Sequence, residues 1–311
     1  MSTFLYLIGL VLLISGVQRS FASVVDNKFE IPSPMRQYCL SSAQLESYVK
    51  NGFLVVTNFF SQGEIQEVVS STKRLQSEAE KLLKTQTGKV LPGKVLHRGT
   101  QFVIDRPINP GDPVVIHRLT WACGMEPGLR TLARQPKLLV PISQLLESRQ
   151  ADHLICQVHP KISGDMVAFG WHQDVQNRRN FDPDWKDIKG NGSFVQTLVA
   201  IDDMDEGNGG LMYVTNDRLG ALGLEAFKDL HLDAPKKIAS LSDRLAAAAI
   251  PIQMKAGDIL FMNPYLVHGS YPNTSERRRI LFINGFSYPG ANKKPYPGEG
   301  SAEKISLTHI I

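Results

Sequence analysis

Residue types that can bind a metal ion occur together in one short stretch, Gly-Trp-His-Gln-Asp at residues 170–174. His172 and Asp174 are separated by a single residue. On an extended strand, residues i and i+2 project from the same face, so the imidazole and the carboxylate can converge without a turn. Because a His-x-Asp triplet also arises by chance, the prediction of a metal site depends on whether the rest of the chain supplies further ligands.

A second histidine ligand is expected from a late strand. His268 follows the β-rich run after Gly257-Asp258, where the chain of an antiparallel barrel can return to the same opening. Two histidines and one carboxylate on one face of a metal form the facial triad of non-haem Fe(II) oxygenases, which leaves positions open for a cosubstrate and O2. The predicted metal ligands are therefore His172, Asp174 and His268, and no catalytic residue is predicted beyond them.

Three consecutive arginines, at positions 277–279, follow the second histidine. With Fe(II), the predicted ligand set carries about one positive charge, which suits a dianionic chelating cosubstrate such as a 2-oxo acid. The far carboxylate of 2-oxoglutarate needs a cationic partner, and a planar guanidinium group binds a carboxylate through two parallel hydrogen bonds. Arg279 begins an apolar run, so we expect it to turn inward, while Arg277 and Arg278 are expected to stay in solvent.

The rest of the chain predicts the elements that position these groups. Capping boxes at Ser41 and Ser61 open two helices, and apolar residues at helical spacing around Pro136 and Pro141 predict one or two more. After Asp152, short β-rich runs are separated by Gly, Asn and Pro turns, which favours a sandwich or barrel over alternating strands and helices. The predicted fold is mainly β with flanking N-terminal helices, a cupin-like jelly roll of the double-stranded β-helix type.

Four blocks occur in a characteristic order along the chain. They are residues 172–174 (HQD), 202–211 (DDMDEGNGGL), 257–258 (GD), and 268–270 (HGS) with Asn273 and Arg279. Together with the opening at 51–56 (NGFLVV), these blocks resemble the phytanoyl-CoA dioxygenase family of Fe(II)- and 2-oxoglutarate-dependent oxygenases. The resemblance covers about residues 40–290 and implies the double-stranded β-helix.

The resemblance also implies roles for individual residues. It implies that iron binds at the three predicted ligands, that 2-oxoglutarate is the cosubstrate, and that Arg279 holds the cosubstrate. It further implies that Ser270 touches the cosubstrate carboxylate and that Gln157, on the strand before the metal motif, lines the same pocket. Relatives that halogenate have a small residue in place of the metal carboxylate. Since Asp174 is present, hydroxylation or a related oxidation is favoured.

The leading interpretation is a dioxygenase that uses Fe(II), 2-oxoglutarate and O2 to hydroxylate a small organic molecule at an unactivated C–H bond, releasing succinate and CO2. Two alternatives stay open: a non-catalytic metal- or ligand-binding jelly roll of the cell envelope, and a cupin-type isomerase or hydrolase that uses Zn or Mn. Arg279 argues against the first, because a pure binding protein has no need of a 2-oxo acid partner. The sequence does not identify the substrate; Lys161, Arg178 and Arg179 are basic residues that an anionic substrate could meet.

Three other polar features have weaker interpretations. Residues 175–193 directly follow the metal motif and predict either a lid that excludes water or a surface insertion. His159-Pro160-Lys161 predicts a turn, so His159 is not expected to be a metal ligand. The acidic residues within 202–206 predict a solvated turn rather than a second cation site.

The N-terminus predicts a targeting segment that lies outside the fold. Residues 4–17 (FLYLIGLVLLISGV) are apolar and uncharged, but the run is shorter than the ~20 residues that cross a bilayer. A small-x-small sequence at residues 20–22 suits signal cleavage, so residues 1–22 are expected to be a signal peptide or an anchor. The protein would then be exported or envelope-associated, and otherwise cytoplasmic.

The remaining domain boundaries follow from composition. Residues 23–40 are a lead-in, residues 41–290 form one catalytic domain with its jelly-roll core at about 152–288, and residues 291–311 form a C-terminal tail. With a net charge of +4 over 311 residues and no basic block beyond 277–279, nucleic acid is not an expected partner. The expected partner is a small molecule, membrane contact is expected only through residues 4–17, and the oligomeric state is not predicted.

The three cysteines show no CxxC or zinc-like spacing. Their odd, small number argues against a disulfide scaffold. Cys156 lies in an apolar run and is expected to be a small buried hydrophobic residue. No functional role is predicted for Cys39, Cys123 or Cys156.

Overall fold

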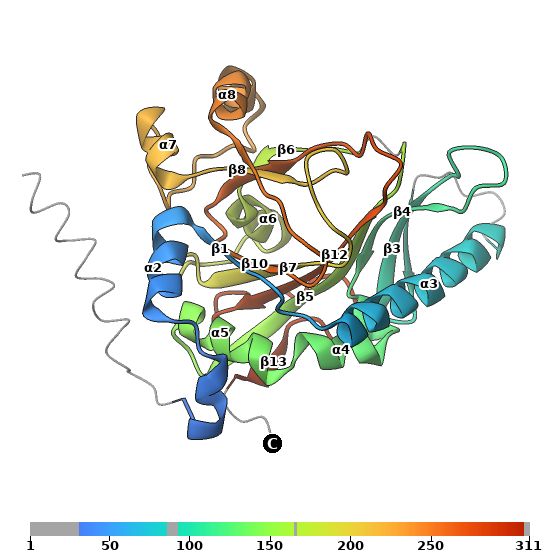
Figure 1. Ribbon diagram of the computed structural model, residues 1–311, viewed down its shortest axis with the longest axis horizontal. Coiled ribbons are helices and arrows are strands. Elements are labelled where there is room, and N and C mark those ends of the chain that lie inside the picture. Colours follow the sequence, from blue (N-terminus) through green and yellow to red (C-terminus); the bar gives the residue numbers. More distant parts are fainter. Residues whose placement is uncertain (1–30, 86–92, 165–166, 308–311) are drawn as a thin grey trace, which may run out of the picture.

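Two facing antiparallel β-sheets form the centre of the molecule, as the ribbon in Figure 1 shows. The computed structural model describes residues 31–85, 93–164 and 167–307. The expected targeting segment at 1–22 and residues 23–30 of the lead-in lie outside the described residues. Within those ranges, no helix is both long enough and apolar enough to span a bilayer.

The large sheet has the strand order β1-β10-β7-β12-β5-β4-β3-β2, and β13 also pairs with β5. Its strands are β1 (Phe53–Val56), β2 (Gly93–His97), β3 (Thr100–Asp105), β4 (Val115–Thr120), β5 (Gln150–Lys161), β7 (Phe194–Ala200), β10 (Ile259–Met262), β12 (Arg279–Ser287) and β13 (Glu303–Ser306). The small sheet has the order β6-β11-β8-β9. Its strands are β6 (Phe169–His172), β8 (Leu211–Val214), β9 (Ile250–Pro251) and β11 (Val267–Ser270). This architecture confirms the predicted mainly β jelly roll with N-terminal helices.

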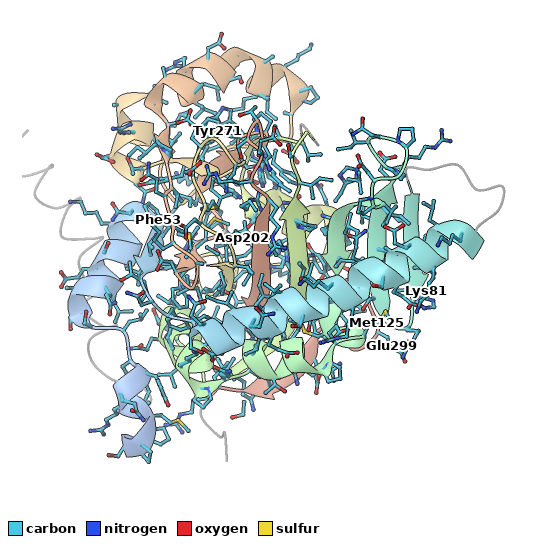
Figure 2. All side chains as sticks on the ribbon, turned by 45° about the vertical axis from the view of Figure 1, so that its right-hand side comes forward. Phe53, Lys81, Met125, Asp202, Tyr271 and Glu299 are labelled. Atoms are coloured by element: carbon cyan, nitrogen blue, oxygen red, sulfur yellow. A yellow bond between two sulfur atoms is a disulfide. The ribbon has the colours of Figure 1, made fainter. Side chains whose placement is uncertain are left out.

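Helices cover the outer face of the large sheet. They are η1 (Ser33–Tyr38), α2 (Ser42–Asn51), α3 (Gln62–Thr85), η2 (Ala122–Gly124), α4 (Pro127–Ala133) and α5 (Pro136–Leu146). In Figure 2 the long α3 crosses this face, with Lys81 near its C-terminal end and Met125 just before α4. Apolar side chains of these helices, such as Leu75 and Leu139, are buried in one core with Phe282 of the sheet. The helices therefore close one face of the sheet and leave its other face for the site.

Both predicted capping boxes are present. The Gln44 amide donates to Ser41 Oγ (3.3 Å), and the Ser41 amide donates to Gln44 Oε1 (2.9 Å). Ser61 and Glu64 make the same reciprocal pair at the start of α3. These bonds satisfy backbone donors that a helix start otherwise leaves free, which explains why the helix starts were readable from sequence.

Strand β5 is longer than the sequence predicts. The expected turn at His159–Lys161 is wrong, because β5 continues to Lys161 and pairs with β12 in the register Arg279↔Lys161 and Leu281↔His159. A proline has no backbone N–H to donate to a neighbouring strand. It fits at position 160 because β4 pairs with β5 only at Val158, so that β12 is the one described strand beside Pro160. As a result, His159 and Lys161 reach the inner face of the sheet.

The cysteine count argued against a disulfide scaffold, and the single disulfide that the structure contains was not predicted. Cys123 and Cys156 form a disulfide, with their Cα atoms 6.0 Å apart, and Cys39 is free. The bond joins η2 to β5 on the outer face of the large sheet. Both paired residues are buried, as predicted for Cys156. The partners are 33 residues apart, and a pairing of this kind is set by the fold rather than by a spacing motif.

Segments after the first half of the chain complete the wall around the two sheets. Helices α7 (Asn216–Ala221) and α8 (Pro235–Ala248) lie beside the small sheet, where Leu241 and Leu245 pack with Trp171. Figure 1 shows α6 (Asp174–Phe181) between the two sheets. The segment expected as a C-terminal tail packs on the domain, since β13 pairs with the first residues of β5.

Candidate metal centre and cosubstrate pocket

Two neighbouring strands and one helix start bring the three predicted metal ligands together. His172 ends β6 and lies opposite His268 of β11. Gln173 keeps an extended backbone (φ −122°, ψ 139°), and Asp174 is the first residue of α6. One ligand atom from each of the three residues lies within 4.8 Å of the others. The strand therefore ends earlier than the i, i+2 argument assumed, but one extended residue is enough to align the two side chains.

The protonation of the histidines suits metal binding. Nδ1 of His172 lies 2.8 Å from the Gly170 carbonyl oxygen, and Nδ1 of His268 lies 3.0 Å from that of Leu266. A carbonyl oxygen only accepts, so both Nδ1 atoms carry a proton and both Nε2 lone pairs are available. Burial, together with the nearby His172, lowers the pKa of His268 to about 4, although Asp174 opposes the shift. His268 is therefore neutral near pH 7.

The carboxylate of Asp174 is incompletely satisfied by the protein. Its Oδ1 accepts from Asn177 Nδ2 at 3.3 Å, while Oδ2 is buried and has no hydrogen-bond partner among the described residues. A buried anionic oxygen without a partner is costly. A divalent cation between this oxygen and the two imidazole nitrogens would supply the missing interaction, so the donor set fits a metal of the Fe(II) type.

A second group of side chains lies beside the metal ligands. Arg279 is 2% exposed and donates from Nη2 to the Gly209 carbonyl oxygen at 2.8 Å. Lys161, opposite Arg279 in the sheet, donates from Nζ to Ser270 Oγ at 2.9 Å. Arg279 therefore turns inward as expected, and Ser270 lies within reach of a cationic pair. A place for Lys161 near the cosubstrate is not predictable from sequence, because only the strand pairing shows that it faces Arg279.

These groups share a cavity of about 460 Å³ between the two sheets. Its wall includes the three predicted metal ligands, Ser270 and Arg279, the expected pocket residue Gln157, and apolar side chains such as Ile155, Leu198, Leu281 and Ile283. His159, which the sequence placed in a turn, also lines the cavity, and its Nε2 donates to Gln157 Oε1 at 2.8 Å. Burial, followed by the nearby Arg118, Arg279 and Lys161, lowers the pKa of His159 well below its usual value. His159 is therefore a neutral hydrogen-bonding group in this pocket.

A comparison with family models covers most of the chain. Residues 48–281 match the model described as Phytanoyl-CoA dioxygenase (PhyH). The chain belongs to the phytanoyl-CoA dioxygenase family. Membership confirms the resemblance seen in the sequence and makes the protein a 2-oxoglutarate-dependent oxygenase that uses Fe(II) and O2. A search among curated proteins found no match.

Solved structures of related enzymes share the fold. The carbocyclase SnoK from nogalamycin biosynthesis, described as non-haem and α-ketoglutarate-dependent, is 14% identical (TM-score 0.58; 84% of this chain and 93% of that chain). HygX from Streptomyces hygroscopicus, solved with nickel and 2-oxoglutarate, is 18% identical (TM-score 0.53; 81% and 88%). EctD from S. alaskensis, solved with 2-oxoglutarate and 5-hydroxyectoine, is also 18% identical (TM-score 0.55; 85% and 86%). At these identities the similarity is one of fold.

In this phytanoyl-CoA dioxygenase family member, the acidic block at 202–206 is a surface turn, as expected. Asp205 accepts from Arg277 Nη2 at 2.8 Å, and Asp202 forms an ion pair with Arg278 at 3.2 Å. These exposed pairs contribute little stability individually. They account for two of the three consecutive arginines and leave Arg279 as the one that faces the cavity.

The segment after the metal motif divides into two parts. Its first part is α6, which has Val175, Gln176 and Arg178 buried and forms a wall of the cavity. The later part is fixed by Asp187, whose carboxylate accepts hydrogen bonds from the backbone of Gly190 and Gly192. The helical part of the segment therefore forms a wall of the cavity, and its own hydrogen bonds hold the later part.

Proposed function

We propose that this phytanoyl-CoA dioxygenase family member hydroxylates a small organic molecule at an unactivated C–H bond. In this reaction substrate, 2-oxoglutarate and O2 give the hydroxylated product, succinate and CO2. The observation that carries the proposal is one cavity that combines an intact His172-Asp174-His268 set with the buried Arg279. Because Asp174 takes the place that a halide would need, oxygen insertion is favoured over halogenation.

Each residue has a separate task in this proposal. The Nε2 atoms of His172 and His268 and the carboxylate of Asp174 would hold Fe(II). The chemistry that Fe(II) supplies when bound is activation of O2, coupled to decarboxylation of 2-oxoglutarate. Arg279 would pair with the far carboxylate of the cosubstrate and Lys161 would add a second positive charge. The apolar wall excludes water around the reacting carbon.

The direct test is a screen of metabolite mixtures for products heavier by one oxygen atom. Product and succinate are expected to form only when Fe(II), 2-oxoglutarate and O2 are all present. His172→Ala and Asp174→Ala should abolish both, whereas Arg277→Gln, which removes a surface ion pair, should leave them unchanged. Failure of the purified protein to bind Fe(II) or 2-oxoglutarate would refute the proposal.

We also propose that the protein matures in an oxidising compartment, as expected for an exported protein. The support is the Cys123–Cys156 disulfide, since such bonds persist mainly in secreted and envelope proteins. The apolar run at 4–17 is consistent with this location. Sequencing of the mature N-terminus after expression in the native host tests it, and recovery of an uncleaved chain from the cytosol would contradict it.

A further inference from the structure

A second cationic cluster, Arg118 and Arg178 beside Tyr296, lines the same cavity as Arg279. Arg178 is its most buried member, with 3% of its surface exposed. The centre of its guanidinium group lies 4.5 Å from the ring centroids of both Phe194 and Tyr296. Its Nε and Nη1 atoms are buried and make no hydrogen bond within the described ranges of the chain. The aromatic rings hold the group in place but do not neutralise its charge.

Arg118 on β4 is the second cation of this cluster. Its Nε is also buried without a hydrogen-bond partner among the described residues. Both Arg118 and Arg178 act electrostatically on the Tyr296 hydroxyl, and all three side chains line the cavity. The buried polar atoms Thr120 Oγ1 and Gln176 Nε2 belong to residues that also line the cavity, and they have no partner among the described residues. The cavity lining therefore contains several buried polar groups that no described residue satisfies.

Within the described residues, Arg118 and Arg178 lack the carboxylate partner that several other arginines have. Ion pairs with carboxylates are formed by Arg74, Arg134, Arg179, Arg277 and Arg278. Among the described residues, neither Arg118 nor Arg178 has such a pair, although Asp174 and Asp233 line the same cavity. Arg178 is buried and Arg118 is partly buried, and a positive charge in such a position is unfavourable unless an anion compensates it. That cost is offset when a ligand brings the anion.

The cosubstrate does not account for this cluster. One end of 2-oxoglutarate belongs at the metal, and its far carboxylate is served by Arg279 and Lys161. We propose that Arg118, Arg178 and Tyr296 form a subsite that binds an oxyanion, a carboxylate or a phosphate, of the primary substrate. The inference rests on the proposed function and adds to it the class of substrate. Because α6 carries Asp174 and Arg178 four residues apart, one helical turn of ~5.4 Å, the oxidised carbon is expected a few bonds from the acidic group.

The test uses the full chain loaded with Mn(II) and 2-oxoglutarate, and measures anion binding by calorimetry. The probes are inorganic phosphate and butyrate, with butyramide as the uncharged match for butyrate. At least one anion should bind and butyramide should not. The anion that binds more tightly shows whether the subsite prefers a carboxylate or a phosphate. Arg118→Gln and Arg178→Gln should each weaken anion binding about tenfold or more, as expected for hydrogen bonds to a charged group. Arg178→Lys should retain part of the affinity.

Controls separate this inference from the proposed function. Arg106→Gln changes an exposed arginine and should alter nothing. Both cluster variants should bind Mn(II) and 2-oxoglutarate as the wild type does, which also shows that they fold. Loss of 2-oxoglutarate binding in these variants, equal anion binding in wild type and variants, or no anion binding would each overturn the subsite. If the wild type binds no 2-oxoglutarate, the proposed function fails, and the same anion titration on metal-free protein still decides the subsite.

Discussion

At the scale of single residues, the site depends on which charges are satisfied by the protein and which are not. Arg279 gives part of its hydrogen-bonding capacity to the carbonyl oxygens of Gly209 and His159. These bonds fix the direction of the guanidinium group before any ligand arrives. Asp174 has the opposite arrangement, since one of its oxygens is buried and unpaired. Arg279 thus offers the positive charge that the cosubstrate would need, and Asp174 offers the negative charge that the metal would need.

Arg279→Gln is expected to weaken 2-oxoglutarate binding by about 100-fold. The substitution removes both the positive charge that faces the far carboxylate and the charge-assisted hydrogen bonds to it. Affinity for the metal should change little, since Arg279 is not one of the three predicted ligands. Anaerobic titration of Fe(II)-loaded protein with 2-oxoglutarate measures both quantities. Arg278→Gln, whose surface partner is Asp202, is the matched control. Unchanged 2-oxoglutarate affinity in Arg279→Gln would show that another cation holds the cosubstrate.

The part of the site that could be predicted from sequence is the part that lies in short motifs. The cluster of His172, Asp174 and His268 and the inward position of Arg279 could be predicted from sequence, because local spacing places two of the residues together and an apolar run draws Arg279 inward. Lys161 and Arg118 could not be assigned, because their positions depend on the pairing of β5 with β12 and of β4 with β5. The disulfide was missed for the same reason, since η2 and β5 meet only in the folded chain.

At the scale of elements, β5 separates two chemical environments. Its inner face carries Gln157 and His159, which line the cavity, and Lys161, which donates to the cavity residue Ser270. Its outer face carries His153, which stacks on Phe286 with ring centroids 4.6 Å apart and lies 5.1 Å from the Trp121 ring. Arg134 Nε donates to His153 Nδ1 at 3.4 Å, and Arg134 pairs with Glu303. An imidazole in this position remains neutral in the folded protein.

Acid should destabilise the protein through His153. Burial, and secondarily Arg134, lowers its pKa to about 3, against a usual value of 6.5. Below pH 6.5 the unfolded chain binds a proton that the folded protein does not, so stability falls as pH falls, by about 1.4 kcal/mol per pH unit. When the pH falls from 6.5 to 5, the free energy of unfolding, measured with urea, should decrease by about 2 kcal/mol less in His153→Phe than in the wild type. The exposed His231→Gln is the control, and equal losses in wild type and His153→Phe would contradict the assignment.

At the scale of the whole molecule, the disulfide ties the helical layer to the sheet that carries the site. Cys123 follows β4, and Cys156 lies beside Gln157 of the cavity wall. A bond that closes a 33-residue loop restricts the unfolded chain and is worth about 3–4 kcal/mol. The stability of the oxygenase should therefore depend on the redox state of its surroundings.

The double variant Cys123→Ala/Cys156→Ala is expected to unfold at lower urea concentration than the wild type, by about 3–4 kcal/mol in free energy. Reductant should destabilise the wild type but not the double variant. Alkylation under denaturing conditions, followed by mass measurement, should find one reactive thiol, Cys39, before reduction and all three cysteines after it. Three reactive thiols without reductant would show that the bond does not form.

Tyr296 lines the cavity but lies outside the part of the chain that matches the family model. The family match ends at residue 281, whereas Tyr296 and Pro297 line the cavity from beyond that point. The predicted ligands for metal and cosubstrate, with Arg118 and Arg178, thus lie inside the matched portion, and Tyr296 of the proposed anion subsite lies outside it. On this proposal, a change in the C-terminal segment would alter the choice of acidic substrate and leave the predicted metal ligands untouched.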